Sequence, residues 1–508
     1  MSSRLKWKLI VPMSGDFRKR NDFFKRGRLA FEAGQYEKAI HAFNKVIEWD
    51  PMDANAHTFR GLAQREIRNF EAALKDLAEV VRIDPHHRVG YLNLGCVQRD
   101  VGQVEEALLS FAKAEEGDPE NPLVYQNRAT ALIAKEDWDT ARSDCETALA
   151  LAPEGAAAYA ILAHVQLGTG EAEQAKLTIE RSLELDPEEA EAYRVRGIIR
   201  CAEDDLEGGI SDFIQARELN PNVSLDYLDN PEVLLKKLLE KLNQLIGLEK
   251  VKEEVRSLIN LVKIRQLRKA SKLPSVPMSL HLVFTGNPGT GKTTIARLIS
   301  LIYHVLGVLS KGHLVEVDRA GLVAGYVGQT ALKVHDVLEK SMGGVLFIDE
   351  AYSLTSRGDA KDFGLEAIDT LIKGMEDKRS DLVIIVAGYP EKMSQFLKAN
   401  PGIKSRFSKV IRFDDYSPTE LMAIFEKMCR EHHYLLESSA RDQALEAFKA
   451  LKPEEVGLYG NGRGVRNFFE LTITRQANRL GELETVDKDQ LVRIVSEDLP
   501  SEDFWVHE

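Results

Sequence analysis

Two short segments contain the residue types that hold and hydrolyse a nucleoside triphosphate. The first reads G-N-P-G-T-G-K-T over residues 286–293, directly after the apolar run 282–284. A glycine-rich turn between a buried strand and a helix lets backbone N–H groups point inward around a polyphosphate, and the helix N-terminus adds its positive dipole end. Glycine is needed where a side chain would clash or forbid the backbone angles. The spacing therefore predicts a phosphate loop.

The side chains of this phosphate loop have distinct expected roles. Lys292 is expected to reach the β- and γ-phosphates, where it supports catalysis, and the Thr293 hydroxyl to bind Mg²⁺. The expected nucleotide contacts are Gly286, Asn287, Pro288, Gly289, Thr290, Gly291, Lys292, Thr293 and Thr294. ATP and Mg²⁺ are therefore the predicted ligands.

The second segment, G-G-V-L-F-I-D-E over residues 343–350, supplies the acidic groups. Its apolar part is typical of a strand buried in a parallel sheet, so Asp349 and Glu350 emerge at the carboxyl end, where such sheets bind ligands. Asp349 is expected to hold the magnesium shell, and Glu350 to orient and deprotonate the attacking water. A glycine turn and an acidic strand end can each arise by chance. Both motifs in order, each in its expected strand context, predict ATP hydrolysis instead.

The elements around these motifs alternate between strands and helices. Strands are expected at 281–285, 314–317, 345–348 and 382–387, and a helix is expected to begin at Lys292. This alternation predicts a doubly wound parallel α/β domain over residues 245–415. Before it, residues 225–244 read as a connector that ends in an amphipathic helix.

A small helical lid domain is expected over residues 416–508. Its first helix has a strong start signal, with Ser417 as N-cap, Pro418 at the first position and Glu420 as the capping-box partner.

The first half of the chain has a period of 34 residues, which is marked by prolines at 51, 85, 119, 153, 187 and 221. Small residues recur at one phase, as Gly27, Gly61, Gly95, Ala129, Ala163 and Gly197, and again at a second phase that includes Ala39 and Ala73. A third phase has the larger residues Phe43, Leu77, Phe111, Cys145, Ile179 and Phe213. This period is that of tetratricopeptide repeats.

Residues 20–224 therefore resemble an α-solenoid of six tetratricopeptide repeats, preceded by an N-terminal extension at 1–19 with no assigned role. The resemblance implies a concave groove that takes a protein client or adaptor. Asn93 and Asn127 share one phase there, and Arg65 and Arg99 share another. These four side chains either line the groove and bind a carboxylate or backbone, or are simply solvated.

Composition limits the remaining functions. The 508 residues suffice for about three domains, and the net charge of −13 argues against a nucleic-acid or anionic-membrane binder. No apolar stretch approaches the ~18 residues of a membrane span. The four cysteines lack metal-site spacing and favour free thiols in a reducing compartment. A cytoplasmic protein without membrane insertion is expected.

Further motifs identify the second half with a known family. Residues 240–500 resemble the CbbX/CfqX branch of AAA+ ATPases through L-I-G-L-E-K-V-K at 245–252, G-Y-V-G-Q-T-A at 325–331, G-G-V-L-F-I-D-E-A-Y at 343–352, A-G-Y at 387–389, N-P-G-I-K-S-R-F at 400–407 and G-N-G-R-G-V-R-N at 460–467. The resemblance implies a homo-hexameric ring in which ATP binds between subunits and hydrolysis moves loops in a central pore.

The resemblance also implies roles for single residues. Arg406 matches the arginine finger that reaches a neighbouring subunit's γ-phosphate, where a guanidinium would offset developing charge, although it could be an ordinary surface arginine. Arg463 matches the sensor-2 arginine of the lid, and Arg466 is its rival. Ile246 and Leu248 would pack on the adenine.

Two tyrosines complete the expected site. Tyr326, between Gly325 and residues 327–328, matches the aromatic pore loop that grips polypeptide, and the alternative is a tyrosine packed in the core. Tyr389 stands where many AAA+ proteins keep a polar sensor-1 residue, so the sequence departs from the family pattern there.

Two functional hypotheses follow. In the first, the repeats recruit a client and the ring remodels or translocates it with ATP. The domain order is similar to that of the cytosolic AAA+ component of type VII secretion systems, and CbbX-like proteins also act as Rubisco activases. In the second, ATP switches a protein-interaction scaffold or a secretion-associated chaperone without pore threading.

Overall fold

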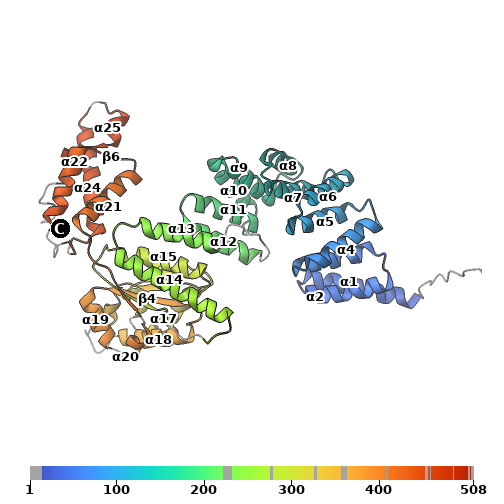
Figure 1. Ribbon diagram of the computed structural model, residues 1–508, viewed down its shortest axis with the longest axis horizontal. Coiled ribbons are helices and arrows are strands. Elements are labelled where there is room, and N and C mark those ends of the chain that lie inside the picture. The colour runs from blue at the N-terminus through green and yellow to red at the C-terminus, as the bar shows by residue number, and fades with distance from the viewer. Residues whose placement is uncertain are drawn as a thin grey trace, which may run out of the picture. The chain divides into compact units, whose positions relative to one another are not determined.

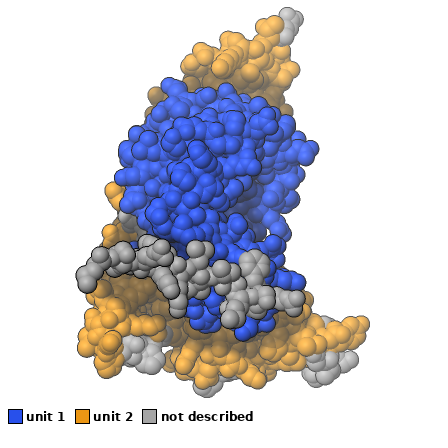
Figure 2. All heavy atoms as spheres, turned by 90° about the vertical axis from the view of Figure 1, so that its right-hand side faces the viewer, with its two compact units in different colours: residues 1–225 blue, residues 226–508 orange. Residues whose placement is uncertain are grey.

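The computed structural model describes residues 14–220, 223, 231–274, 279–324, 326, 329–355, 363–399, 401–407, 409–451, 456, 457, 459–483, 485–500 and 504. The chain divides into two compact units, residues 1–225 and 226–508, which have separate colours in Figure 2. Each unit has hydrophobic clusters of its own.

The described part of the first unit consists of helices that pack in consecutive pairs (Figure 1). The pairs are α1 (Ser14–Glu32) with α2 (Tyr36–Trp49), α3 (Ala54–Glu66) with α4 (Phe70–Ile83), α5 (Arg88–Asp100) with α6 (Val104–Gly117), α7 (Pro122–Ile133) with α8 (Trp138–Leu151), α9 (Ala156–Gly168) with α10 (Ala172–Leu185), and α11 (Ala190–Ala202) with α12 (Leu206–Leu219). Helix α1 begins at Ser14, so part of the expected N-terminal extension belongs to the first pair.

The small and large phases of the repeat face each other within each pair. A Cβ added to Gly95 would lie 2.6 Å from the Phe111 ring, and one added to Gly197 would lie 2.7 Å from the Phe213 ring. Both phenylalanines are almost fully buried. Because the rings occupy the space that a side chain at the glycine would need, the two helices approach closely. This close contact explains why the two residue types recur together.

Every second repeat also has a buried ion pair between its two helices. The pairs are Arg60 with Asp76, Arg128 with Asp144, and Arg196 with Asp212. In each pair the arginine contacts both carboxylate oxygens, and the aspartate side chain is at most 7% exposed. A two-point contact of this kind satisfies a buried carboxylate.

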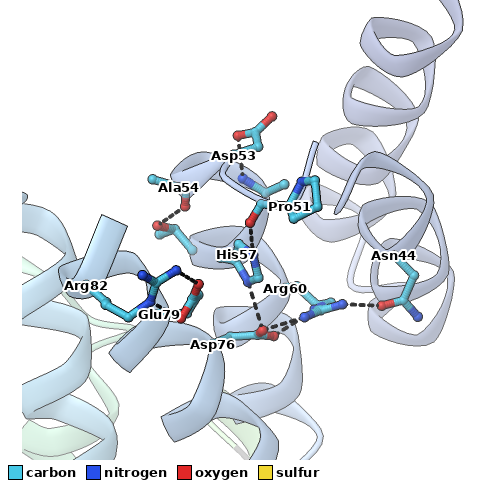
Figure 3. A network of polar contacts seen from close by, with 11 residues as sticks. Asn44, Pro51, Asp53, Ala54, His57, Arg60, Asp76, Glu79 and Arg82 are labelled. Carbon is cyan, nitrogen blue, oxygen red and sulfur yellow. Dashed lines mark hydrogen bonds and ion pairs between the residues drawn. The ribbon is translucent and has the colours of Figure 1, made fainter. Parts of the chain in front are cut away.

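Figure 3 shows the first of these ion pairs and its neighbours. Arg60 also donates to Asn44 Oδ1 of the preceding pair at 2.6 Å, and His57 lies 3.0 Å from Asp76 and 3.1 Å from the Pro51 carbonyl. Burial favours the neutral acid, but the hydrogen bonds from Arg60 and His57 outweigh it and hold the pKa of Asp76 below its ordinary value. Arg60 therefore links two successive repeats.

The second unit contains a five-stranded sheet in the order β2-β3-β4-β1-β5, in which all neighbours are parallel. The strands are β1 (Leu282–Thr285), β2 (Leu314–Val317), β3 (Val345–Ile348), β4 (Val383–Gly388) and β5 (Lys409–Arg412). The register pairs Thr285 with Gly388 and with Arg412, so these strands end at one common edge. The central strands β1, β3 and β4 are fully buried, as expected for a parallel sheet covered on both faces.

Helices cover both faces of this sheet (Figure 1). On one face lie α13 (Pro231–Gln244), α14 (Glu249–Ala270) and α15 (Lys292–Val305), and α13 packs on α15. The other face packs against α17 (Gln329–Lys340), α18 (Gly364–Asp377), α19 (Pro390–Ala399) and α20 (Pro401–Arg406) in one apolar cluster. Two short elements, α16 (Arg319–Leu322) and the 3₁₀ helix η1 (Ala351–Thr355), lie on the connections beyond β2 and β3.

The lid has its own apolar core of helix and strand residues. Its elements are α21 (Pro418–Glu431), β6 (Leu435–Leu436), α22 (Ser438–Ala450), α24 (Gly462–Gly481), α25 (Lys488–Val492), β7 (Arg493–Ile494) and the 3₁₀ helix η2 (Ser496–Asp498). The predicted start of α21 is confirmed, because Ser417 Oγ accepts from the Glu420 N–H at 3.3 Å and the Glu420 carboxylate accepts from the Ser417 N–H at 2.7 Å.

The structure adds strands that the sequence pattern did not predict. Strand β5 lies at the sheet edge with only Ile411 buried, so it lacks the continuous apolar run that marks the central strands. The lid also contains the parallel pair β6 and β7, two residues each, in addition to its helices. The lid is a helical domain, as predicted, and this short strand pair is a minor addition to it.

Candidate active site

The phosphate loop leaves β1 and leads directly into α15, as the motif predicts. Gly289 and Gly291 have φ values of +71° and +90°, which L side chains rarely adopt. A Cβ on Gly286 would lie 2.6 Å from the Phe413 carbonyl oxygen, and one on Gly289 would lie 2.0 Å from the Gly460 carbonyl oxygen. The loop thus needs glycine both for its backbone angles and for its close contact with the lid.

Lys292 lies over the phosphate loop. Its Nζ donates to the carbonyl oxygens of Gly286 at 3.0 Å and Asn287 at 2.7 Å. Burial lowers the pKa of Lys292, and the nearby Asp349 carboxylate acts in the opposite direction. An ammonium group has three N–H donors, so a phosphate oxygen can join these two carbonyls as an acceptor.

The acidic pair follows β3 at the carboxyl edge of the sheet. The Asp349 N–H donates to Val317 at the end of β2, and Asp349 Oδ1 accepts from the Glu350 N–H, both at 2.9 Å. Glu350 is exposed and has a φ of +47°, a conformation that a residue other than glycine adopts at some cost. Glu350 therefore has an exposed side chain just beyond the end of the strand.

An aromatic pair lies beside Glu350. Tyr352 and Tyr389 have ring centroids 6.0 Å apart, and Lys392 Nζ lies 4.6 Å and 5.0 Å from the two centroids. Burial, and then the negative charge of the Glu350 carboxylate and a hydrogen bond to it, raise the pKa of Tyr352. Tyr389 follows the end of β4, and its ring lies beside that of Tyr352. Sequence reasoning missed Tyr352 and Lys392, although Tyr352 lies within the quoted 343–352 motif.

The expected adenine side borders the phosphate loop. A Cβ on Gly291 would lie 3.4 Å from Leu248 Cδ1, and the Tyr416 hydroxyl donates to the Thr290 carbonyl at 3.5 Å. Ile246 and Leu248 are both half-buried. Leu248 therefore lies next to the phosphate loop, where its apolar side chain could pack on the adenine base of a bound nucleotide.

The lid reaches the phosphate loop through the start of α24. The Gly462 N–H donates to the Gly289 carbonyl at 3.2 Å. Arg463 is exposed, and its positive charge is close enough to contribute to the lowered pKa of Lys292. Arg466 is exposed about one helical turn further along α24. Arg463 is therefore the lid arginine that borders the loop at the start of the helix.

Arg406 lies away from this group of residues. It pairs with Glu376, and its backbone carbonyl accepts from Ser279, which precedes β1. Arg406 itself precedes β5, whereas the phosphate loop follows β1. Parallel β1 and β5 therefore place Arg406 at the amino edge of the sheet and the phosphate loop at the carboxyl edge. The side chain is not assembled with its own chain's phosphate loop.

Tyr326 is 74% exposed, which does not fit a side chain packed in the core. Its flanking residues 325, 327 and 328 lie outside the described residues. The base of this segment is held by contacts with α17, because the Ala324 N–H donates to Thr330 Oγ1 at 3.1 Å and Lys333 Nζ donates to the Ala320 carbonyl at 2.6 Å. Tyr326 is therefore an exposed side chain between two described ends, residues 320–324 and α17, that are bonded to each other.

Three of the four residues predicted for the repeat groove are connected through Asp100. Arg65 donates to Asp100 at 2.6 Å, and Arg99 donates to Asp100 at 2.9 Å and to Asn127 Oδ1 at 2.8 Å. Asn93 is half-buried. Arg65, Arg99 and Asn127 form an internal network, so neither of the two predicted states, direct ligand binding or simple solvation, describes them fully.

The residues at the carboxyl edge fit a magnesium-bound triphosphate. The loop supplies backbone N–H groups at a helix N-terminus, Lys292 supplies a cation, and the Thr293 hydroxyl and Asp349 carboxylate supply the oxygen ligands that Mg²⁺ prefers. Glu350 supplies an exposed carboxylate beside them. The set corresponds to nucleotide binding and water activation.

Comparisons with known proteins agree with this assignment. Residues 282–415 match the model of the ATPase family associated with various cellular activities (AAA), residues 417–508 match the AAA lid domain, and residues 24–88, 92–156 and 132–199 match tetratricopeptide repeat models. The second unit is thus an AAA domain with its lid, and the first is a tetratricopeptide repeat array.

Three relatives show the family more closely. Stage V sporulation protein K of Bacillus subtilis (strain 168) is 45% identical over 267 residues, which cover 52% of this chain and 83% of the relative. Protein CbbX of Cereibacter sphaeroides is 44% identical over 48% of this chain and 79% of its own length. The chloroplastic ribulose bisphosphate carboxylase/oxygenase activase of Cyanidioschyzon merolae is 43% identical over 50% and 87%. The chain belongs to this CbbX/CfxQ-type family of AAA ATPases and is an ATP-hydrolysing enzyme.

None of the helices within the described ranges combines the length and the apolar character that a transmembrane span requires.

Proposed function

We propose that this chain hydrolyses ATP with Mg²⁺ in order to remodel or translocate a protein client that its repeat unit recruits. The observation that carries the proposal is the placement of Lys292, Asp349 and Glu350 at one edge of the sheet, with Arg463 beside them and Arg406 at the opposite edge. A complete site therefore needs Arg406 from a second copy of the chain.

Each residue of this site has a proposed part. Lys292 holds the β- and γ-phosphates, Thr293 and Asp349 hold Mg²⁺, and Glu350 accepts a proton from the attacking water. Bound Mg²⁺ would neutralise charge on the phosphates. The guanidinium of Arg406 would stabilise the charge that develops on the neighbour's phosphoryl group.

The ring arrangement follows from this division of the site. Because Arg406 and the phosphate loop lie at opposite edges, a closed ring of identical subunits can complete every site, and we propose a homo-hexamer in the cytoplasm. Tyr326, whose side chain is exposed, would grip the client. Arg463 would transmit the state of the nucleotide to the lid.

The repeats are proposed to choose the client. The three relatives are matched over about half of this chain, and the names of two of them refer to sporulation and to ribulose bisphosphate carboxylase/oxygenase activation. One type of motor thus serves different systems, and the repeat array is an obvious source of specificity. The similarity of domain order to the type VII secretion component stays a prediction.

The shared site can be tested with two variants in one ring. We expect Glu350→Gln to bind ATP and lose more than about a hundredfold in turnover, because the attacking water lacks its base. Arg406→Ala should also lose turnover, because its neighbour's phosphate lacks the guanidinium. Mixing the two variants should restore part of the ATPase activity, since some interfaces then combine an intact base with an intact arginine.

The outcomes separate the competing assignments. Phosphate release would be measured at several mixing ratios. If it never exceeds the level of the two separate variants, the site is not shared between subunits. Retained turnover in Glu350→Gln would overturn the assignment of the base. With ATP bound, Glu350→Gln rings should also retain the client. The alternative, an ATP-switched scaffold, predicts that Tyr326→Ala leaves the processing of that client unchanged.

A further inference from the structure

Asn461, which lies immediately before α24, is a nearly buried polar residue that the functions assigned so far do not use. It is 2% exposed, and its side chain contacts two other segments of the chain. Its amide Nδ2 donates to Asp415 Oδ1 at 2.8 Å and to the Pro288 carbonyl at 3.4 Å, and its Oδ1 accepts from the Tyr416 N–H at 2.9 Å. One side chain therefore joins the lid helix, the hinge before α21 and the phosphate loop.

A second amide converges on the same carboxylate. Asn287 Nδ2, within the phosphate loop, lies 3.0 Å and 2.9 Å from the two oxygens of Asp415. A Cβ on Gly457 would lie 2.3 Å from this Nδ2, so the lid segment approaches the amide closely. Asp415 is consequently bonded on one side to the phosphate loop and on the other to the segment that starts α24.

The backbone of Asn461 indicates that its side chain is required. Its φ and ψ are +52° and −122°, a conformation that favours glycine and is costly for other residues. Both neighbours, Gly460 and Gly462, are glycines. Asparagine stands in the strained position between them, where its amide makes three hydrogen bonds, and the side chain compensates for a backbone cost that glycine would avoid.

We infer that Asn461 is a positioning residue that, through Asp415, latches the lid to the phosphate loop and so makes the lid orientation follow the state of the loop. The inference rests on the proposed function of that loop as the site of ATP. Residues 287–289 of the loop are held to the lid side by the Asn287, Asn461 and Gly462 contacts. If the loop rearranges around phosphates, either these hydrogen bonds break or the lid moves with the loop.

The latch differs from the proposed role of Arg463. Arg463 would contact the nucleotide directly, whereas Asn461 has its hydrogen-bonding groups occupied by protein atoms. Asn461 thus acts through the loop and the hinge, and the coupling it provides exists with or without nucleotide.

The test measures the distance between lid and core directly. Spin labels would be placed at Asp336→Cys in α17 and Asp442→Cys in α22, which are exposed, whereas the four native cysteines are buried. In the otherwise unchanged full-length chain, we expect a narrow distance distribution that shifts when ATP and Mg²⁺ are added. In Asn461→Gly we expect a broad distribution in both conditions.

Nucleotide affinity gives a second readout. The Kd for ATP should rise roughly tenfold in Asn461→Gly, about the effect of losing one net hydrogen bond of 1.4 kcal/mol. Asn461→Ala should weaken affinity at least as much, because it loses the amide and keeps the strained backbone. Since glycine relieves the strain, a purely structural Asn461 would make Asn461→Gly equal to or better than the native chain.

The results distinguish the latch from the function on which it rests. Native-like distances and native-like ATP affinity in Asn461→Gly would overturn the latch while leaving the ATP site intact. If the native chain binds no ATP, the proposed function fails instead. A broad distribution in Asn461→Gly that ATP still narrows to the native width would also refute the latch, because coupling would then persist without the amide.

Discussion

The two units stabilise their buried polar groups in different ways. In the repeat unit, Arg128 reaches Asp144 only 16 residues away, and the same pairing recurs one double repeat earlier and later. In the second unit, Asn461 reaches Pro288 across 173 residues, and this contact has no counterpart elsewhere in the described chain. A repeat array thus divides its stability among similar local contacts, whereas the active site depends on single long-range ones.

Backbone strain shows the same contrast. In the repeat unit, positive φ values occur every 34 residues, at Gly34, Arg68, Gly102, Glu136, Gly170 and Asp204. Glycine alternates there with other residues, and the repeats that lack glycine are those with the buried ion pairs. In the second unit, positive φ values have no such period: those of Leu248, Glu350 and Asn461 border the candidate active site, whereas those of Lys272 and His433 follow the ends of α14 and α21. Positive φ values are therefore periodic in the repeat unit, and in the second unit several of them occur at the site.

Among the contacts compared here, we expect the largest effect from the loss of the buried ion pair between Arg128 and Asp144. Replacing Arg128 by alanine leaves the buried Asp144 carboxylate without its partner, so we expect the repeat unit to lose about 3 kcal/mol of stability. Hydrogen exchange should localise the loss to α7 and α8, with ATP turnover unchanged. Arg181→Ala, which removes an exposed 3.1 Å pair with Glu184, should leave stability nearly unchanged. Equal effects of the two variants would contradict the importance of the buried pair.

A smaller effect is expected at His281, just before β1. Burial, with a contribution from Arg406, lowers its pKa from 6.5 to about 4, and its Nδ1 accepts from the Ile384 N–H at 2.9 Å. The unfolded chain takes up a proton below pH 6.5 while the folded chain stays neutral. The free energy of unfolding is therefore at its full value above pH 6.5. It decreases progressively as the pH falls from 6.5 toward 4, because only the unfolded chain gains the proton on His281.

At pH 5 this loss should be about 2 kcal/mol. Unfolding free energies measured from pH 7 to pH 4 would show it as a slope, and His281→Gln, which does not titrate, should flatten that slope in the second unit. Parallel slopes in the two proteins would rule out His281 as the cause.

The smallest effect concerns two tyrosine hydroxyls. Tyr303 in α15 is 1% exposed, and its hydroxyl has no hydrogen-bond partner among the described residues. Tyr303→Phe should therefore leave stability unchanged or raise it by up to about 1 kcal/mol. The Tyr125 hydroxyl in the repeat unit donates to Pro119 at 2.9 Å, so Tyr125→Phe should cost about 1 kcal/mol. Denaturant unfolding would measure the stability of both variants. A loss of stability in Tyr303→Phe would contradict the absence of a hydrogen-bond partner for the Tyr303 hydroxyl.

Local patterns in the sequence predicted most of the fold. The four predicted strands coincide with β1 to β4 within one residue at each end, because they are short apolar runs beside recognisable turns. The edge strand β5 was missed because only Ile411 is buried. The repeat helices follow from a period in which Gly95 and Phe111 must occur together. Such signals lie within a few turns of chain, where spacing alone is informative.

The sequence by itself determined the phosphate loop, the acidic strand end and the repeat period, since each depends on neighbours along the chain. Only the tertiary structure placed Arg406 at the far edge of the sheet and Asn461 between the lid and the phosphate loop. These positions depend on strand order and on contacts between segments more than a hundred residues apart. Packing decides such contacts, and a single sequence does not display them as a pattern.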